Sequence, residues 1–238
     1  MRTTLTLLLI AAACGAAACG DDDTASTPSA ASVAASATAA APERGTADDG
    51  EVAVASCAQA DAPKAKSADT PKPTGSLDPD KNYYAVLKTS CGTITIKLDQ
   101  RNNPKTANAF ATLVRAGYYD GLSFHRVVKG WVVQGGDPSG TGAGGPPWQV
   151  VEAPPKDAQY TRGTVAMAKT PTDPDGASGS QFFIVVGDDA GLPAQYAIAG
   201  HVKTGRAVVD AISDLAGDEP DGPPARPIVI ESATLEVK

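Results

Sequence analysis

Between residues 83 and 238 the chain contains a series of short runs in which β-branched and aromatic residues predominate. The first two, at 83–89 and 93–98, flank a Ser-Cys-Gly turn, a pattern typical of a β-hairpin. The length and composition of the later runs also favour strands over helices. These later runs lie at 122–128, 130–137, 163–169, 180–187, 196–202 and 228–237.

Two other segments repeat their apolar residues with the period of a helix. In the first, Asn103 can cap the N-terminus, Pro104 suits the first helical position and Gly117 can end the helix. The second begins near Thr204, which we expect to cap it. The apolar stripes consist of Ala107, Phe110, Ala111 and Val114 in the first helix, and of Val208, Ala211, Ile212 and Leu215 in the second.

Many short strands with only two isolated helices indicate a mainly β fold. A parallel βαβ arrangement would need a helix between most strands, and the sequence does not provide them. We therefore predict a β-barrel whose open ends are covered by the two helices.

The first 19 residues have the layout of an export signal. Arg2 precedes an apolar run, Leu5 to Ala13, that is too short to span a bilayer as a permanent helix. Small residues then lead to a cysteine and Gly-Asp-Asp-Asp, which resembles the cleavage and acylation site of bacterial lipoproteins. Cys14 and Cys19 both follow three alanines, and we prefer Cys19 because the polar stretch begins directly after it. Acyl chains there would anchor the mature chain to a membrane; the alternative is an ordinary cleaved signal.

Residues 20–82 are rich in Ala, Ser, Thr, Pro, Asp and Lys, and no aromatic residue occurs between Cys19 and Tyr83. Such a segment cannot bury enough apolar surface to offset the entropy lost on ordering it. We predict a flexible tether at 20–82, followed by one globular domain at 83–238, which is long enough for a sizeable core.

Charge and cysteine content limit the possible partners. The formal net charge is -7 and no basic cluster stands out, so we do not expect nucleic-acid binding. In an exported protein the remaining pair, Cys57 and Cys91, favours a disulfide, with two free thiols as the alternative. The cysteines and the two histidines, His125 and His201, do not have a spacing suited to zinc, so we expect no metal site.

Common catalytic motifs are missing from the sequence. It has no Gly-X-Ser-X-Gly, no dinucleotide-binding glycine motif after a first strand and no P-loop, and neither histidine neighbours an obvious nucleophile. The run 123–138 instead places Arg126, Trp131 and Gln134 among apolar residues. One fixed cation among apolar and amide side chains suits a reaction without covalent intermediate, proton transfer or cofactor, although these residues alone do not identify it.

Three ordered blocks then resemble the cyclophilin family of peptidyl-prolyl cis–trans isomerases. They are FHRVVKGWVVQGGDPSGTGAGG, GTVAMAK and GSQFFIVVG, and the resemblance extends over about 83–238. It implies an eight-stranded antiparallel β-barrel capped by two α-helices, a monomeric enzyme without cofactor, and proline-containing peptides as substrates.

The resemblance also assigns the catalytic pair. Arg126 matches the family's catalytic arginine, and Gln134 matches the glutamine that anchors it and contacts the peptide. Amide resonance opposes rotation about an X–Pro bond with a barrier of about 20 kcal/mol. In the twisted state the proline nitrogen accepts a hydrogen bond, which a guanidinium can donate. The alternative for Arg126 is a structural salt bridge to a barrel carboxylate.

By the same resemblance, the proline ring would enter a small apolar pocket. Backbone groups at Ala168 and Lys169 would pair with the extended peptide. Trp131, Val132, Lys169 and Tyr196 differ from the residues common in the family, so the pocket floor and the side-chain contact at 169 are expected to differ too. The predicted walls are Trp131, Val132, Phe183, Leu192 and Tyr196, with Gln181 at the rim.

Together these observations predict a lipid-anchored isomerase at the outer face of the cell membrane that assists the folding of exported proteins. Two alternatives remain: a binding module that holds proline-containing segments without accelerating isomerisation, and an isomerase released as a soluble secreted protein.

Overall fold

The computed structural model describes residues 57–238. The predicted signal segment, the acylation sites Cys19 and Cys14, and positions 20–56 of the predicted tether lie outside these residues. Within the described part of the chain, no helix is both long and apolar enough to cross a membrane.

The elements of the described residues follow the predicted order closely. They are β1 (Tyr83–Thr89), β2 (Gly92–Leu98), α1 (Pro104–Arg115), β3 (Phe124–Val128), β4 (Val132–Gly135), β5 (Val150–Val151), β6 (Thr164–Met167), β7 (Ala177–Ser178), β8 (Phe182–Val185), β9 (Ile198–Thr204), α2 (Arg206–Ser213) and β10 (Ile230–Val237).

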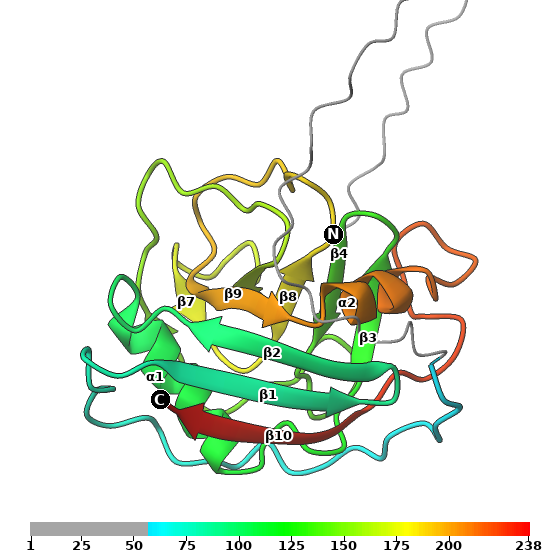
Figure 1. Ribbon diagram of the computed structural model, residues 1–238, viewed down its shortest axis with the longest axis horizontal. Coiled ribbons are helices and arrows are strands. Elements are labelled where there is room, and N and C mark those ends of the chain that lie inside the picture. Colours follow the sequence, from blue (N-terminus) through cyan, green and yellow to red (C-terminus); the bar gives the residue numbers. More distant parts are fainter. Residues whose placement is uncertain (1–56) are drawn as a thin grey trace, which may run out of the picture. The chain divides into compact units, whose positions relative to one another are not determined.

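Eight of these strands form one curled sheet in the order β10-β1-β2-β9-β6-β8-β4-β3, and every neighbouring pair is antiparallel (Figure 1). The two outer edges meet where Ser123 bridges Val229 and where the Phe124 amide donates to the Ile228 carbonyl at 2.9 Å. The predicted fold class, an eight-stranded antiparallel barrel with two helices, is thus confirmed. The short strands β5 and β7 form a separate pair in the loops.

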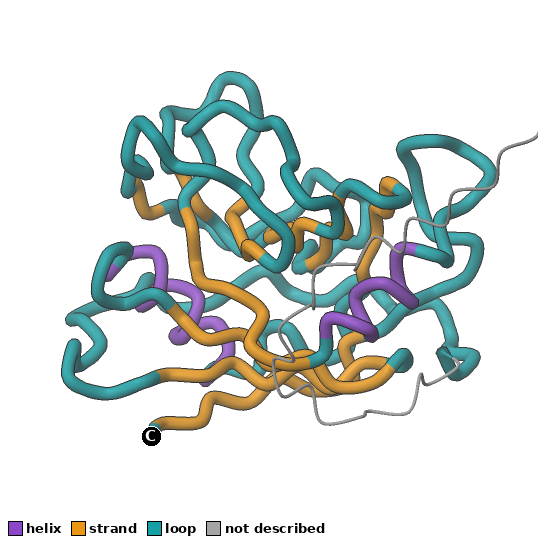
Figure 2. The backbone as a smooth tube through the Cα atoms, turned by 45° about the horizontal axis from the view of Figure 1, so that its top comes forward, coloured by secondary structure: helices purple, strands orange, loops and turns teal. Residues whose placement is uncertain are grey.

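The two helices lie on either side of the strands (Figure 2). Helix α1 begins after Asn103 with Pro104 in its first turn, as predicted, but the Asn103 side chain makes no capping hydrogen bond. The Glu152 carboxylate caps the helix instead, because it accepts hydrogen bonds from the amides of Lys105 and Thr106 at 3.1 and 2.8 Å.

The predicted cap of the second helix is wrong. Thr204 is the last residue of β9, and Gly205 is the N-cap of α2 with φ of 90°. A Cβ at Gly205 would lie 2.3 Å from the Thr93 carbonyl oxygen, so the close approach of the chain to β2 requires glycine here. In the predicted stripe, Val208 and Ile212 are buried, while Ala211 and Leu215 are partly buried against the core.

Strands β4 and β8 are buried on both faces. Val133 and Ile184 belong to the main hydrophobic core, which also contains the buried apolar residues of both helices. Val132, Phe183 and Val185 belong to a second, smaller cluster on the opposite face. This alternation follows from the two-residue period of a strand, and it leaves the second cluster to support a surface site.

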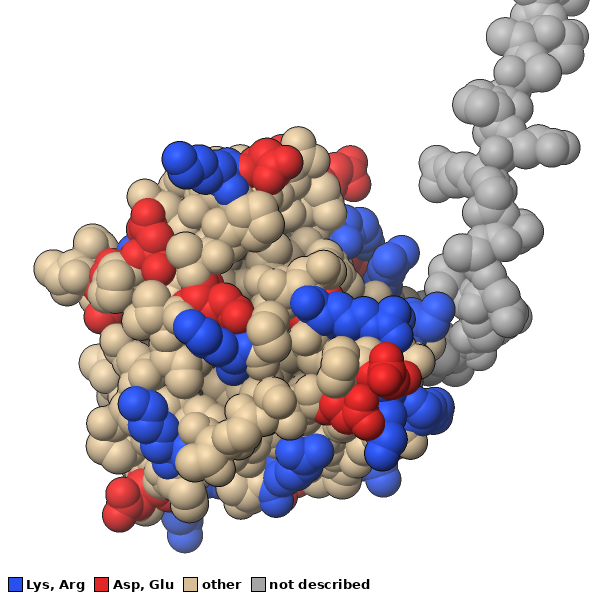
Figure 3. Space-filling model, turned by 90° about the vertical axis from the view of Figure 1, so that its left-hand side faces the viewer, with Lys and Arg blue, Asp and Glu red and all other residues tan. Residues whose placement is uncertain are grey.

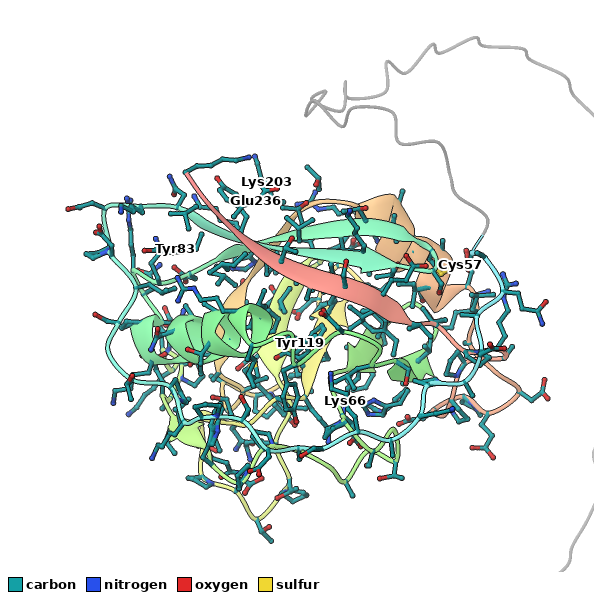
Figure 4. All side chains as sticks on the ribbon, turned by 90° about the horizontal axis from the view of Figure 1, so that it is seen from below. Cys57, Lys66, Tyr83, Tyr119, Lys203 and Glu236 are labelled. Carbon is teal, nitrogen blue, oxygen red and sulfur yellow. A yellow bond between two sulfur atoms is a disulfide. The ribbon has the colours of Figure 1, made fainter. Side chains whose placement is uncertain are left out.

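Residues 57–82, called the strap below, run across the domain surface from Cys57 to Tyr83 (Figure 4). The predicted Cys57–Cys91 disulfide is present and joins the start of the strap to the turn between β1 and β2. Lys66 donates to the carbonyls of Gly117 and Asp120 at 3.2 and 2.9 Å, and Leu77 is buried.

The strap therefore differs from the predicted tether, whose end was placed at residue 82. The strap contains few large apolar residues, and the disulfide, backbone hydrogen bonds and the buried Leu77 attach it to the domain. Apart from the disulfide, which was predicted, contacts of this kind are not visible as a periodic pattern in the sequence.

Acidic and basic side chains are interspersed on the face shown in Figure 3. They do not form there the concentrated basic surface that binding to a phosphate backbone requires. Several opposite charges are paired, among them Lys129 with Asp214 at 3.2 Å.

Candidate active site

A cavity of about 160 Å³ opens beside the second hydrophobic cluster. Its lining comes from β3, β4 and β8, from the end of β6 and from the loop before β9. All the residues that line it were predicted site residues. They are Arg126, Trp131, Val132, Gln134, Ala168, Lys169, Phe183, Leu192 and Tyr196.

Arg126 and Gln134 are direct partners in the register of β3 and β4. Arg126 Nη1 donates to Gln134 Oε1 at 2.9 Å, and Gln134 Nε2 donates to Gln181 Oε1 at 3.0 Å. Gln181 Nε2 in turn donates to the carbonyls of Gly142 and Gly144 at 2.9 and 2.8 Å. The predicted rim residue Gln181 therefore lies next to the cavity and fixes the orientation of the Gln134 amide.

A carboxylate that the sequence analysis missed completes the environment of Arg126. Asp221, in the loop between α2 and β10, accepts from Nε at 2.6 Å and from Nη2 at 2.8 Å. The hydrogen bond from Arg126 lowers the pKa of Asp221, so the carboxylate is ionised at neutral pH. The alternative of a salt bridge is thus realised with a loop residue, while Arg126 still lines the cavity.

The remaining donors of Arg126 are limited in number. A guanidinium has five N–H groups, and Asp221 and Gln134 together take three of them. Among the described residues, this leaves one N–H on Nη1 and one on Nη2 without a hydrogen-bond partner, and the Arg126 side chain lines the cavity. The guanidinium carbon also lies 5.6 Å from the centre of the Trp131 ring, and the Trp131 indole is fixed by a 2.9 Å bond to the Ala190 carbonyl.

The apolar walls are held by aromatic contacts. The rings of Phe183 and Tyr196 meet edge to face with centres 5.5 Å apart. Tyr160, which is fully buried and was not predicted, donates its hydroxyl to the Tyr196 carbonyl at 2.8 Å and accepts from the Tyr196 amide at 2.9 Å. Tyr160 thus fixes the loop that carries Tyr196. This role was not predicted from the sequence, because Tyr160 does not belong to any recognised motif.

At the end of β6, one of the backbone groups predicted to pair with a peptide already has a partner within the domain. The Ala168 amide already donates to the Gln181 carbonyl at 2.9 Å, so it is not available to a peptide. The Lys169 side chain folds back onto its own loop, where Nζ donates to the Thr170 and Asp173 carbonyls at 3.3 and 3.2 Å. Peptide pairing at this edge is thus restricted to the Ala168 carbonyl and the Lys169 backbone.

A second cavity of about 330 Å³ adjoins the first and shares Gln134, Ala168 and Lys169 with it. Its other walls include Trp148 and the loop 142–145. The Trp148 indole donates to the Thr70 carbonyl at 2.9 Å, so the strap supports this wall.

The loop 137–145 is wound around the carboxylate of Asp137. Although burial opposes ionisation, hydrogen bonds from Ser139, Gly144 and Gly142 lower the pKa of Asp137. The Asp137 carboxylate therefore fixes the loop that forms one wall of the second cavity.

The first cavity combines apolar walls with the polar side chains of Arg126, Gln134 and Lys169. Its lining contains no serine, cysteine, histidine or carboxylate that could act as a nucleophile or general base. The arrangement can hold an apolar ring and donate hydrogen bonds from Arg126 to an atom that becomes a better acceptor during a reaction.

Comparisons with known proteins agree with this geometry. Residues 84–235 match the family model described as cyclophilin type peptidyl-prolyl cis-trans isomerase/CLD. The probable peptidyl-prolyl cis-trans isomerase A of Mycobacterium leprae is 36% identical over 172 residues, covering 65% of this chain and 93% of that protein. Peptidyl-prolyl cis-trans isomerase B of Streptomyces anulatus is 35% identical over 175 residues, covering 66% and 99%.

Among solved structures, a cyclophilin type peptidyl-prolyl cis-trans isomerase of Cryptosporidium parvum, determined in the presence of the dipeptide Ala-Pro, is similar to this chain. The TM-score is 0.59 and the sequence identity is 29%, with 64% of this chain and 98% of that chain covered. The strap lies outside the residues that the family model matches.

Proposed function

The chain belongs to the cyclophilin-type peptidyl-prolyl cis-trans isomerase family, and on this basis we propose that Arg126 is its catalytic residue and that its substrates are proline-containing segments of exported proteins. The chain is a peptidyl-prolyl isomerase. The observation that supports the residue assignment is that Arg126 lines the cavity and retains two N–H groups that neither Asp221 nor Gln134 occupies.

The geometry suggests how the barrier falls. The proline ring enters the cavity between Phe183, Val132 and Leu192, which holds one side of the X–Pro bond in place. As the bond twists, its nitrogen loses conjugation and becomes an acceptor for an N–H of Arg126. Because this hydrogen bond is weak in the planar states and strong in the twisted state, it stabilises the transition state selectively.

Gln134 holds the guanidinium of Arg126 in place beside the cavity. Its carbonyl oxygen accepts from Arg126 and its amide is held by Gln181, so neither side chain has to reorient during the reaction. A lysine at 126 would lack this planar fork and could not keep the anchor while donating to the substrate.

We further propose that the enzyme works outside the cytoplasm, attached to the cell membrane through Cys19. The signal-like residues 1–19 support this location. The Cys57–Cys91 disulfide supports it as well, since such bonds persist in oxidising compartments. Labelling with a fatty acid in cells, compared between the native chain and Cys19→Ser and Cys14→Ser variants, tests the anchor and distinguishes it from a soluble secreted form.

The catalytic assignment is tested by measuring isomerisation of an X–Pro peptide by NMR exchange with the purified full chain. Arg126→Ala should lower kcat/KM at least about tenfold, equivalent to about 1.4 kcal/mol of transition-state stabilisation. Arg162→Ala is the matched control, because Arg162 also binds an aspartate but lies outside the cavity. A folded native chain without rate enhancement would favour the module that holds proline-containing segments without isomerising them.

A further inference from the structure

Asp221 holds the guanidinium of Arg126 in one orientation through two hydrogen bonds. Its two carboxylate oxygens accept from Nε and Nη2 at 2.6 and 2.8 Å, which fixes the guanidinium plane on one side. Gln134 fixes Nη1 from the other side at 2.9 Å. We propose that Asp221 is a positioning residue for isomerisation, which keeps the two remaining N–H groups of Arg126 directed at the substrate; this rests on the catalytic role proposed for Arg126.

The exposure of the pair argues against a role in stability alone. The Asp221 side chain is 56% exposed and that of Arg126 30% exposed. Ion pairs so accessible to water contribute little to folding stability, because both charges are well solvated before they pair. A two-point contact on a planar group, by contrast, restricts the rotation of a long and otherwise mobile side chain.

The loop that carries Asp221 is itself fixed beside β3. The Val127 amide donates to the Gly222 carbonyl at 2.8 Å, so the residue after Asp221 pairs with the residue after Arg126. The Ala225 amide closes the loop by donating to the Leu215 carbonyl at 2.8 Å. Backbone pairing, and not the ion pair alone, therefore places the carboxylate opposite the guanidinium.

The two anchors act from separate elements. Gln134 belongs to β4 and lines both cavities, whereas Asp221 lines neither the smaller nor the larger one. Asp221 therefore acts through Arg126 and does not bind the peptide. Its loss should reduce the rate of the chemical step and leave the affinity for the peptide almost unchanged.

The test compares Asp221→Ala, Asp221→Asn and Asp210→Ala in the full chain by NMR exchange on an X–Pro peptide. Asp210 is the matched control, because it binds Arg162 Nη2 through both oxygens at 2.7 and 2.6 Å on α2, outside the cavities. We expect Asp221→Ala to lower kcat about five- to tenfold with KM changed less than about twofold. Asp221→Asn, which keeps one acceptor, should be intermediate, and Asp210→Ala should retain the native rate.

A double-mutant cycle separates positioning from a general structural role. In an Arg126→Ala background, Asp221→Ala should have no further effect on kcat. An equal loss in both backgrounds, or a raised kcat in the single variant, would overturn the inference. So would a native kcat in Asp221→Ala.

The two proposals fail in different ways. If Arg126→Ala lowers the rate and Asp221→Ala does not, the positioning role alone is rejected. If Arg126→Ala itself keeps the native rate, the catalytic assignment is rejected and the positioning role with it. Denaturant unfolding of every variant shows whether each one is folded, so that a lost rate is not mistaken for a lost fold.

Discussion

The two faces of β4 and β8 show how one pair of strands can serve two purposes. On one face, Val133, Phe182 and Ile184 pack into a closed core. On the other, Val132 and Phe183 form the floor of an open cavity. Apart from Gln134, both faces carry apolar side chains, so hydrophobicity alone does not distinguish the core from the site.

The core face and the cavity face differ in their polar side chains and in how their aromatic rings pack. On the core face, the ring of Phe182 meets three other buried rings, of Phe110, Tyr119 and Phe124, at centre distances of 5.4 to 5.9 Å. On the cavity face, Phe183 meets Tyr160 and Tyr196, and the space beside them stays open at about 160 Å³. The closed face is built for stability, and the open face keeps room for a ligand next to Arg126.

The largest expected effect comes from adjacent phenylalanines on the two faces. Phe182→Ala should lower the free energy of unfolding by about 3–5 kcal/mol, because it opens a cavity among fully buried rings. Phe183→Ala should cost less stability, since one side of that ring already borders a cavity, but should lower kcat/KM at least about tenfold. Denaturant unfolding and NMR exchange measure the two quantities.

Each phenylalanine is the control for the other. The comparison between the two faces breaks down if Phe183→Ala destabilises the chain as much as Phe182→Ala. It also breaks down if Phe182→Ala, under conditions in which it is folded, loses as much activity as Phe183→Ala.

A smaller effect is expected from removing the disulfide. The bond closes a loop with a sequence separation of 34, so the Cys57→Ser and Cys91→Ser double variant should lose about 2–4 kcal/mol of unfolding free energy. Both cysteines belong to the core cluster and neither lines the smaller cavity, so kcat/KM on a short X–Pro peptide should change less than about twofold. Denaturant unfolding gives the first quantity, and reductant should destabilise the native chain but not the double variant.

The smallest expected effect is a pH dependence of stability that arises from His125, the residue before Arg126 in β3. Burial lowers the pKa of His125, and the charge of Arg126 acts in the same direction while Asp137 opposes it. The unfolded chain, with an ordinary histidine pKa of about 6.5, therefore takes up a proton at a higher pH than the folded one. The stability from neutral His125 is fully present above the unfolded-state pKa and is lost as the pH falls from that value through the lower pKa of the folded state.

Unfolding measured between about pH 7 and pH 5 should thus show stability declining with pH, and less steeply in His125→Phe. His201→Gln is the control. Partial desolvation lowers the pKa of His201 as well, but His201 is more exposed than His125, so the slope should change less. An unchanged slope in His125→Phe would show that His125 does not contribute to the pH dependence of stability.

The local patterns of the sequence predicted the elements well. The hairpin at 83–98, the start of α1 at Asn103 and Pro104, and the later strands all follow from periodicity and from residues with strong local preferences. The residues around the cavity came from the resemblance to a family, since valine or phenylalanine in a strand is ambiguous between core and site.

Contacts between distant loops were not predictable in this way. Asp221 lies 95 residues from Arg126 in a loop with no periodic pattern, and Glu152 caps α1 from 46 residues away. Tyr160 forms its hydrogen bond with Tyr196, which lies 36 residues further along the chain. Such pairs depend on how the chain closes in three dimensions, which local preference does not encode.

The Cys57–Cys91 bond also decides where the folded domain would bear a mechanical load. A pull applied to the chain ahead of residue 57 reaches the domain at Cys91, in the turn between β1 and β2, through a covalent link. Residues 58–82 are bypassed, so their hydrogen bonds to the surface are not peeled away one at a time. With the bond reduced, the same force would detach the strap from its start. After the hydrogen bonds of Lys66 were lost, Trp148 would lose its contact with Thr70, and one wall of the larger cavity would lose that support.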